Sequence, residues 1–133
     1  MESQGYAPLL EAHVIHQPFR LFGKTIVPIP LLHGSTPTTG YRIDNTAYLT
    51  DCSGIPDSSR VLLGGLDILI IDALRYTPHI THFNIEGALR VVAELKPKRA
   101  IFTHLTHEVS CTDGDRLPAG VELAYDGMIL QTG

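Results

Sequence analysis

The sequence predicts an α/β fold with a mixed sheet and few helices, and three segments support this prediction. The run Leu66–Ala73 is apolar nearly throughout, which is typical of a central strand in a parallel sheet, covered on both faces. From Ile85 onward, apolar residues recur at the i, i+3, i+4, i+7 spacing of an amphipathic helix. A second short apolar run lies in Arg99–Thr103. Residues 66–104 therefore predict a right-handed strand–helix–strand unit.

The amino-terminal part of the chain predicts further strands. These are Ala12–Gln17, Phe19–Phe22, Thr25–Leu32, Gly40–Ile43 and Ala47–Thr50. Asp44-Asn45 is a favourable turn pair between the last two strands, and Ser35–Thr39 is expected to form a polar loop. Pro28 and Pro30 lack backbone donors, so their strand is expected to be irregular or to lie on an edge.

The remaining segments complete a single domain or half-domain over residues 1–133. We expect residues 1–11 to be a loop or a disordered end, and Ser58–Leu63 to form a short helix. The segment Val109–Leu117 predicts a polar loop. Val121–Ala124 and Met128–Leu130 predict a closing hairpin around Asp126-Gly127.

Composition excludes several classes of protein. The formal net charge is −4 and no basic run occurs, which argues against binding to nucleic acid. No apolar stretch reaches the roughly 18 residues of a membrane span, and no signal-peptide pattern is present. The two cysteines form no disulfide framework, so we expect a reducing, cytoplasmic location.

Histidine and aspartate residues recur at or just beyond the predicted strand ends. They are His33, Asp51, Asp72, His82 and His104. In α/β proteins the carboxyl ends of the strands are the usual position of a functional site, so this repetition predicts one site assembled from several strands. Imidazole and carboxylate groups suit Zn²⁺, Mn²⁺ or Fe²⁺.

Each of these residues also has an ordinary structural interpretation. Asp51 can be a turn or helix-capping residue, and His82 can be a loop histidine that packs at the entry to the following helix. The structural interpretation is stronger for His79, which lies further from that helix. His13 and His16 stand three positions apart on a predicted strand, so they point to opposite faces and do not share a metal.

Several short motifs together resemble the metallo-β-lactamase superfamily. The segments Leu32–Gly34, Gly40–Ile43 and Tyr48–Cys52 resemble its third and fourth motifs, and the remainder is matched by Leu66–Asp72, Thr81–Asn84 and Phe102–His107. The segments Leu117–Glu122 and Tyr125–Met128 are similar to the carboxyl terminus of PhnP-type cyclic phosphodiesterases. The resemblance implies the second βα half of an αββα sandwich.

The resemblance also implies a role for each residue of the site. The metal ligands would be His33 on a first metal, Asp51 bridging two metals, and His104 on the second, with zinc or manganese as the metal. His82 would assist catalysis by donating a proton to the leaving group or by stabilising developing charge. Asp72 and His107 would support these residues. In the family, a metal-bound hydroxide attacks the phosphorus of a small phosphodiester-like substrate.

One departure from the family is large, because the His-x-His-x-Asp-His motif expected upstream of His33 does not occur. Each metal would keep about two protein ligands, so we expect weak or absent catalysis from this chain alone. One sheet face would also lack its cover. Three interpretations remain open: a truncated hydrolase that lacks its amino-terminal half, a non-catalytic half-domain that self-associates or pairs with a partner through that face, and a small metal-binding module.

Overall fold

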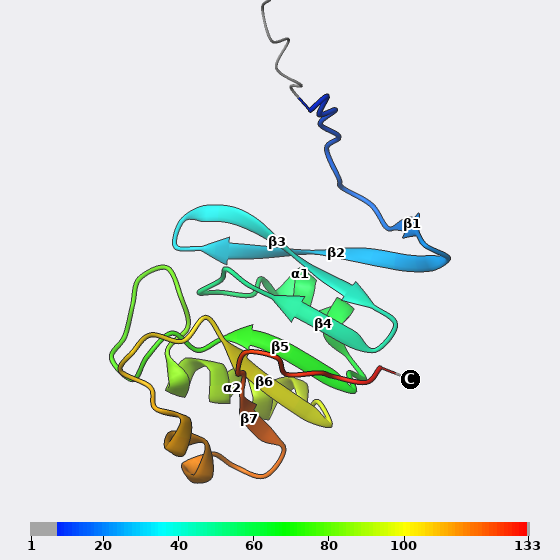
Figure 1. Ribbon diagram of the computed structural model, residues 1–133. Helices are drawn as coiled ribbons and strands as arrows, with labels where there is room; N and C mark the ends of the chain where they lie inside the picture. Colours follow the sequence, from blue (N-terminus) through cyan, green and yellow to red (C-terminus); the bar gives the residue numbers. More distant parts are fainter. Residues whose placement is uncertain (1–7, 133) are drawn as a thin grey trace, which may run out of the picture.

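The computed structural model describes residues 8–132, which form one seven-stranded sheet with the strands in chain order from β1 to β7 (Figure 1). The strands are β1 (Phe19–Leu21), β2 (Lys24–His33), β3 (Thr36–Ile43), β4 (Thr46–Leu49), β5 (Ile68–Asp72), β6 (Arg99–Thr103) and β7 (Val121–Leu123). Strands β1 to β4 pair antiparallel, whereas β4 to β7 pair parallel. The predicted mixed α/β sheet with few helices is therefore confirmed.

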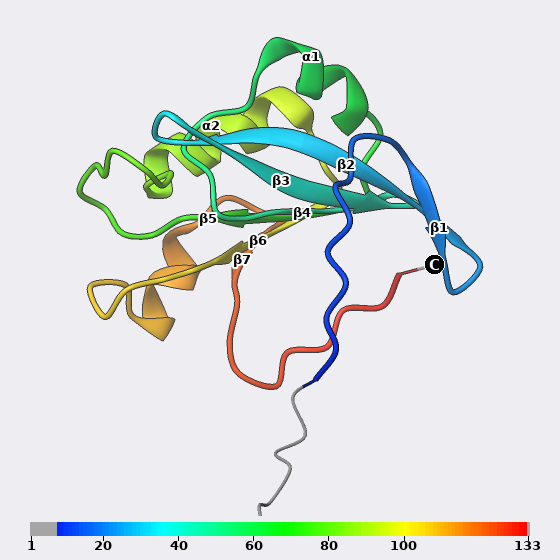
Figure 2. The ribbon, with the colours of Figure 1, turned by 90° about the horizontal axis from the view of Figure 1, so that it is seen from above.

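The two α-helices lie on the same face of the sheet (Figure 2). The short helix α1 (Asp57–Arg60) continues into a 3₁₀ turn, as predicted for this region, and α2 (Ile85–Leu95) connects β5 to β6. Helix α2 begins at Asn84, whose side chain accepts a hydrogen bond from the backbone N–H of Gly87 at 2.9 Å. No helix within residues 8–132 has the length and apolar character needed to cross a bilayer.

The core lies between the sheet and the helices. Leu49, Leu69 and Phe102, on neighbouring parallel strands, are completely buried there. Gly40 lies opposite Leu49, where a Cβ atom would stand 2.7 Å from Leu49 Cδ2, 2.8 Å from the Tyr48 carbonyl oxygen and 2.9 Å from Leu31 Cδ1. Only glycine fits at this point of the sheet without displacing its neighbours.

The opposite face of the sheet carries a continuous row of largely apolar side chains. The strand registers place Pro28, Tyr41, Tyr48, Ile70 and Ile101 side by side across it. The chain beyond β7 runs along this side of the sheet (Figure 2). Tyr48 is 49% exposed, whereas Ile101 is 1% exposed, so the row is only partly covered.

The two prolines of β2 occupy a section of the strand that is open on one side. Strand β1 pairs with β2 only as far as Ile26. The carbonyl oxygen of Pro30 accepts a hydrogen bond from the Ser59 hydroxyl at 2.6 Å, so the backbone of this residue faces away from β3. Pro28 shares this orientation, because alternate residues of a strand direct their backbone groups to the same side. The strand as a whole lies between β1 and β3, so the expected edge position is wrong for β2, and only its section with the two prolines is open on one side.

Two predictions for the amino-terminal region are wrong. The segment Ala12–Gln17 forms no strand, because it has no neighbouring strand and its apolar residue Val14 is 81% exposed. The predicted loop Ser35–Thr39 belongs mostly to β3, which begins at Thr36 after a tight turn at Gly34 with φ 63°. Residues 8–11 lie outside any helix or strand, and residues 1–7 lie outside the described part of the chain.

Two predictions for the carboxyl-terminal region are also wrong. Cys111–Arg116 is a 3₁₀ helix within the predicted loop, stabilised by a capping box between Ser110 and Asp113. The turn at Asp126-Gly127 does form, since the Met128 N–H donates to the Tyr125 carbonyl at 3.0 Å. However, Met128–Leu130 is not a strand, and β7 pairs parallel with β6 instead.

Candidate metal and catalytic site

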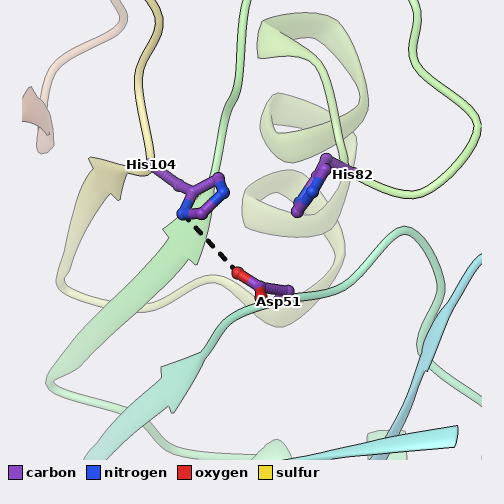
Figure 3. Close-up of side chains that lie close together, drawn as sticks. All are labelled: Asp51, His82 and His104. Carbon is purple, nitrogen blue, oxygen red and sulfur yellow. Dashed lines mark ion pairs between the residues drawn. The ribbon is translucent and has the colours of Figure 1, made fainter.

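A cluster of three side chains lies at the carboxyl ends of the parallel strands (Figure 3). Asp51 follows β4, His104 follows β6, and His82 belongs to the loop before α2. Their potential ligand atoms all lie within 4.8 Å of one another. The dashed line in Figure 3 joins Nδ1 of His104 to Oδ1 of Asp51, which lie 3.5 Å apart. One carboxylate and two imidazoles therefore converge from three separate segments.

His82 is held by a buried carboxylate. Its Nδ1 lies 2.8 Å from Oδ2 of Asp72, which is fully buried and also accepts the backbone N–H of Cys52 at 2.8 Å. A carboxylate accepts hydrogen bonds, so the proton of neutral His82 resides on Nδ1 and the lone pair on Nε2. Within residues 8–132, no donor reaches the second oxygen of Asp72.

The His82 ring lies between two other histidine rings. Its Nε2 is 3.2 Å from Nε2 of His33, and these two rings meet edge to face with centroids 4.7 Å apart. The His104 ring stacks on the other side, also at 4.7 Å. Because Asp72 fixes the His82 proton on Nδ1, the Nε2–H of His33 is the donor in the contact between the two histidines. Asp72, His82 and His33 thus form one chain of hydrogen bonds.

The backbone positions of two members of the cluster, Asp51 and His104, are restrained. His104 has φ 60°, a left-handed conformation that costs free energy for any residue other than glycine. The Thr50 hydroxyl donates to Oδ1 of Asp51 at 2.9 Å, and the Thr38 hydroxyl donates to the Asp51 carbonyl at 2.8 Å. The site is therefore held by groups from β3, β4 and β6 together.

The structure brings all four predicted site residues, His33, Asp51, His82 and His104, to the same edge of the sheet. His107 is not a member of the converging group within the described residues. Sequence analysis assigned no role to His79, yet its ring centroid lies 5.5 Å from that of His82. The sequence signal that could have indicated this was the spacing of His79 and His82, which stand three residues apart in the loop before α2.

Cys52 is a second contributor that the sequence did not reveal. Its backbone N–H, not its thiol, contacts the site through Asp72. Burial raises the pKa of the Cys52 thiol, and the nearby carboxylates of Asp72 and Asp51 raise it further. The thiol is therefore protonated near neutral pH in the chain without metal, and it is not a member of the converging group of ligand atoms within the described residues.

The donor set of this cluster fits a divalent metal. Carboxylate oxygen and imidazole nitrogen are ligands of Zn²⁺ and of Mn²⁺, and Asp51 and His104 offer such atoms within reach of each other. The Asp72 contact on Nδ1 of His82 resembles the second partner that commonly orients a histidine in a metal site. This chemistry does not distinguish between the two metals.

Fold and site together define an α/β protein with a candidate metal site at the carboxyl ends of its parallel strands. Residues 2–105 match the family model described as the Beta-lactamase superfamily domain. The chain therefore belongs to the β-lactamase superfamily, and the predicted resemblance is confirmed.

Several solved structures share this fold. A diphosphatase from the PhnP family superimposes with a TM-score of 0.88 at 44% sequence identity, covering 90% of this chain and 48% of that one. The metallo-β-lactamase fold protein YhfI from Bacillus subtilis gives a TM-score of 0.71 at 23% identity, covering 89% of this chain and 54% of that one. The short form of human tRNase Z gives 0.65 at 21% identity, covering 85% of this chain and 45% of that one. The last two likenesses show the fold alone.

A curated relative is the octanoyltransferase of Porphyromonas gingivalis (strain ATCC BAA-308 / W83). It is 30% identical over 114 residues, which cover 84% of this chain but 23% of that protein. The chain thus spans less than a quarter of this relative and about half of the PhnP-family diphosphatase.

Proposed function

We propose that this chain carries part of the active site of a metal-dependent hydrolase that cleaves small phosphodiester-like substrates. The observation that carries the proposal is the convergence of Asp51, His82 and His104 within 4.8 Å at the strand ends. The 44% identity to a PhnP-family diphosphatase supports a phosphorus ester as the substrate. Two free cysteines, Cys52 and Cys111, support a reducing, cytoplasmic setting.

Each residue of the cluster has a distinct role in this proposal. His33, Asp51 and His104 would hold the metal, with His33 giving up its Nε2 contact to His82, and the bound metal would supply Lewis acidity that polarises a phosphoryl oxygen. His82 transfers the proton, because Asp72 keeps Nδ1 occupied and leaves Nε2 turned toward the cluster. In its protonated form, His82 donates from Nε2 to the departing oxygen. The Asp72 carboxylate stabilises the positive charge that His82 then carries.

Activity of the isolated chain is expected to be weak. The described cluster offers few protein donors, and a catalytic zinc site typically has three. The PhnP-family diphosphatase is about twice as long as this chain, so residues from its other half have no counterpart here.

Metal titration of single-residue variants tests the proposal. We expect purified protein to bind zinc or manganese, and we expect Asp51→Asn and His104→Ala each to lower the affinity at least about tenfold. His82→Gln should keep the metal but lose the residual hydrolysis of bis(p-nitrophenyl) phosphate. His13→Ala, at a side chain 73% exposed and outside the site, is the matched control. Equal metal affinity in His104→Ala and the unsubstituted chain would refute the proposal.

The partly covered row on the sheet face favours a second candidate function, in which the chain self-associates through that face. Tyr48 stands at the centre of the row with 49% exposure. We expect light scattering to give the mass of a dimer, and Tyr48→Glu to give a monomer. The control is Val61→Glu on the helical side, where the side chain is 83% exposed. A monomeric unsubstituted chain excludes this function.

A further inference from the structure

Two cavities border the cluster, one lined by His104 and the other by His82, and their linings differ in charge. The cavity beside His104 has a volume of about 420 Å³ and includes Tyr125 and the carboxylate of Asp126. The cavity beside His82 has a volume of about 310 Å³ and is lined by Ser53, Pro78, His79, Ile80, His82, Phe83, Asn84, Gly87 and Arg90. No acidic residue lines this second cavity, although the chain as a whole carries a net charge of −4.

His79 lines this cavity, and its hydrogen bonds define which ring nitrogen carries the proton in the neutral form. Its Nδ1 lies 3.2 Å from the backbone N–H of Thr81 and 3.0 Å from the Thr81 hydroxyl. A backbone N–H can only donate, so Nδ1 is the acceptor and the ring proton of neutral His79 lies on Nε2. With its Nδ1 occupied in this way, His79 offers Nε2–H to a ligand as a donor.

Arg90 supplies the permanent positive charge of the cavity. One of its terminal nitrogens bonds to Glu86, one helical turn earlier, and both side chains are 71% exposed. A guanidinium has five N–H donors, so this contact leaves donors available for an anion. Glu86 itself does not line the cavity.

Three backbone amides at the start of α2 already have acceptors within the protein. The N–H of Gly87 donates to the Asn84 side chain, that of Ile85 to the Arg75 carbonyl, and that of Phe83 to the Cys52 carbonyl. These three amides are not available to a ligand, so His79 and Arg90 are the groups whose contribution substitution can test.

We infer that the cavity beside His82 binds a second anionic group of the substrate, a phosphate or phosphonate held by His79 Nε2–H and the guanidinium of Arg90. The inference rests on the proposed function, because it takes the cluster as the position of the reacting phosphorus. A substrate with two adjacent phosphoryl groups then lies with the second group on the His82 side. The other substituent of the reacting phosphorus extends toward Tyr125, away from the cationic cavity.

Anion binding by the full chain tests this inference without any hydrolysis. The probes are methylenediphosphonate, which has two linked anionic groups, and methylphosphonate, which has one. Binding is followed by NMR on the ring nitrogens of His79 and the Nε–H of Arg90, first in chelator-treated protein and then with zinc. We expect methylenediphosphonate to bind at least about tenfold more tightly than methylphosphonate. Its second phosphonate adds two charge-assisted contacts, one to His79 and one to Arg90.

Four variants show which side chains are responsible. His79→Gln and Arg90→Gln should each weaken diphosphonate binding about five- to tenfold and leave methylphosphonate binding within about twofold. Glu86→Gln, which releases Arg90 from its partner, should tighten diphosphonate binding. Arg20→Gln removes a charge on β1, outside the cavity, and should change nothing. All four side chains are exposed, so these substitutions leave the core intact.

The outcomes separate this inference from the proposed function. Equal binding of the two probes, or diphosphonate binding that is insensitive to both His79→Gln and Arg90→Gln, overturns the inference even if zinc binds to the cluster. If zinc does not bind but the preference that depends on His79 and Arg90 persists, the anion site in this cavity stands, whereas the proposed function and the role of that site in substrate binding fall.

Discussion

Replacement of Asp72 by asparagine tests the hydrogen-bond chain that orients His82. The carboxylate is completely buried, and its Oδ2 accepts two hydrogen bonds, each 2.8 Å long, from His82 Nδ1 and the Cys52 N–H. In Asp72→Asn, the new amide oxygen accepts the hydrogen bonds from His82 and Cys52 only when the amide NH₂ group lies at the position of Oδ1. At that position, no hydrogen-bond partner lies within the described residues.

The expected cost follows from either orientation of the new amide. With the NH₂ at the Oδ1 position, a buried donor is unsatisfied, which costs about 1–3 kcal/mol. With the NH₂ turned toward Cys52, the backbone N–H loses its acceptor at a similar cost. We therefore expect Asp72→Asn to lower the free energy of unfolding by about 1–3 kcal/mol. For a small domain this shifts the urea midpoint by about 0.5–2 M.

The second readout of Asp72→Asn is the tautomer of His82. In the unsubstituted chain without metal, ¹⁵N NMR should show Nδ1 protonated and Nε2 free. An asparagine NH₂ that faces the ring favours the opposite tautomer, so the variant should show a mixture or a reversal. The control is Asp57→Asn, a fully exposed carboxylate on α1, which should change stability by less than about 0.5 kcal/mol. An unchanged midpoint together with unchanged ring signals in Asp72→Asn would refute this explanation.

Three further predictions concern positions outside the site. Gly40→Ala should lower the free energy of unfolding by about 1–3 kcal/mol, because its Cβ would overlap neighbouring strands; an unchanged denaturation midpoint contradicts this. In native protein near pH 8, a disulfide reagent should label exposed Cys111 but not Cys52, whose thiol pKa is raised by burial; labelling of both before unfolding contradicts this. The hydrogen bond from Lys98 lowers the pKa of Asp67, so its stabilising contribution is present at neutral pH and is lost as the pH falls through the folded-state pKa. An NMR titration should show that Lys98→Gln raises the pKa of Asp67 toward its ordinary value.

The central part of the sheet was predictable because its signals are local. The apolar run Leu66–Ala73 contains β5, and the helical spacing from Ile85 coincides with the start of α2. Asp44-Asn45 forms the predicted turn between β3 and β4. At these positions pattern and tertiary environment agree, so propensity alone identifies the element.

The wrongly predicted segments are those in which tertiary contacts decide whether a strand forms. Ala12–Gln17 alternates like a strand but has no neighbouring strand to pair with. Thr36 and its successors are polar, but pairing with β2 draws them into the sheet. Tertiary context overrides intrinsic strand propensity in both cases.

The candidate site was predictable in its membership but not in its geometry. Parallel strands end at the same edge, so histidines and aspartates that follow such strands meet there. The carboxylate of Asp72, at the end of β5, contacts His82 in the loop that joins β5 to α2, and the His79 ring lies beside the His82 ring in the same loop. These contacts depend on loop conformations, for which the sequence has no simple period.

The sequential order of the strands has a consequence for how the chain folds. Every strand is hydrogen-bonded to the one synthesised just before it, so no early segment must wait for a distant partner. The antiparallel strands β1 to β4 are joined by short turns, which favours early pairing, whereas the parallel strands β5 to β7 pair only after longer connections have formed. His104 follows β6, so Asp51 and His82 meet it only after α2 and β6 have been synthesised.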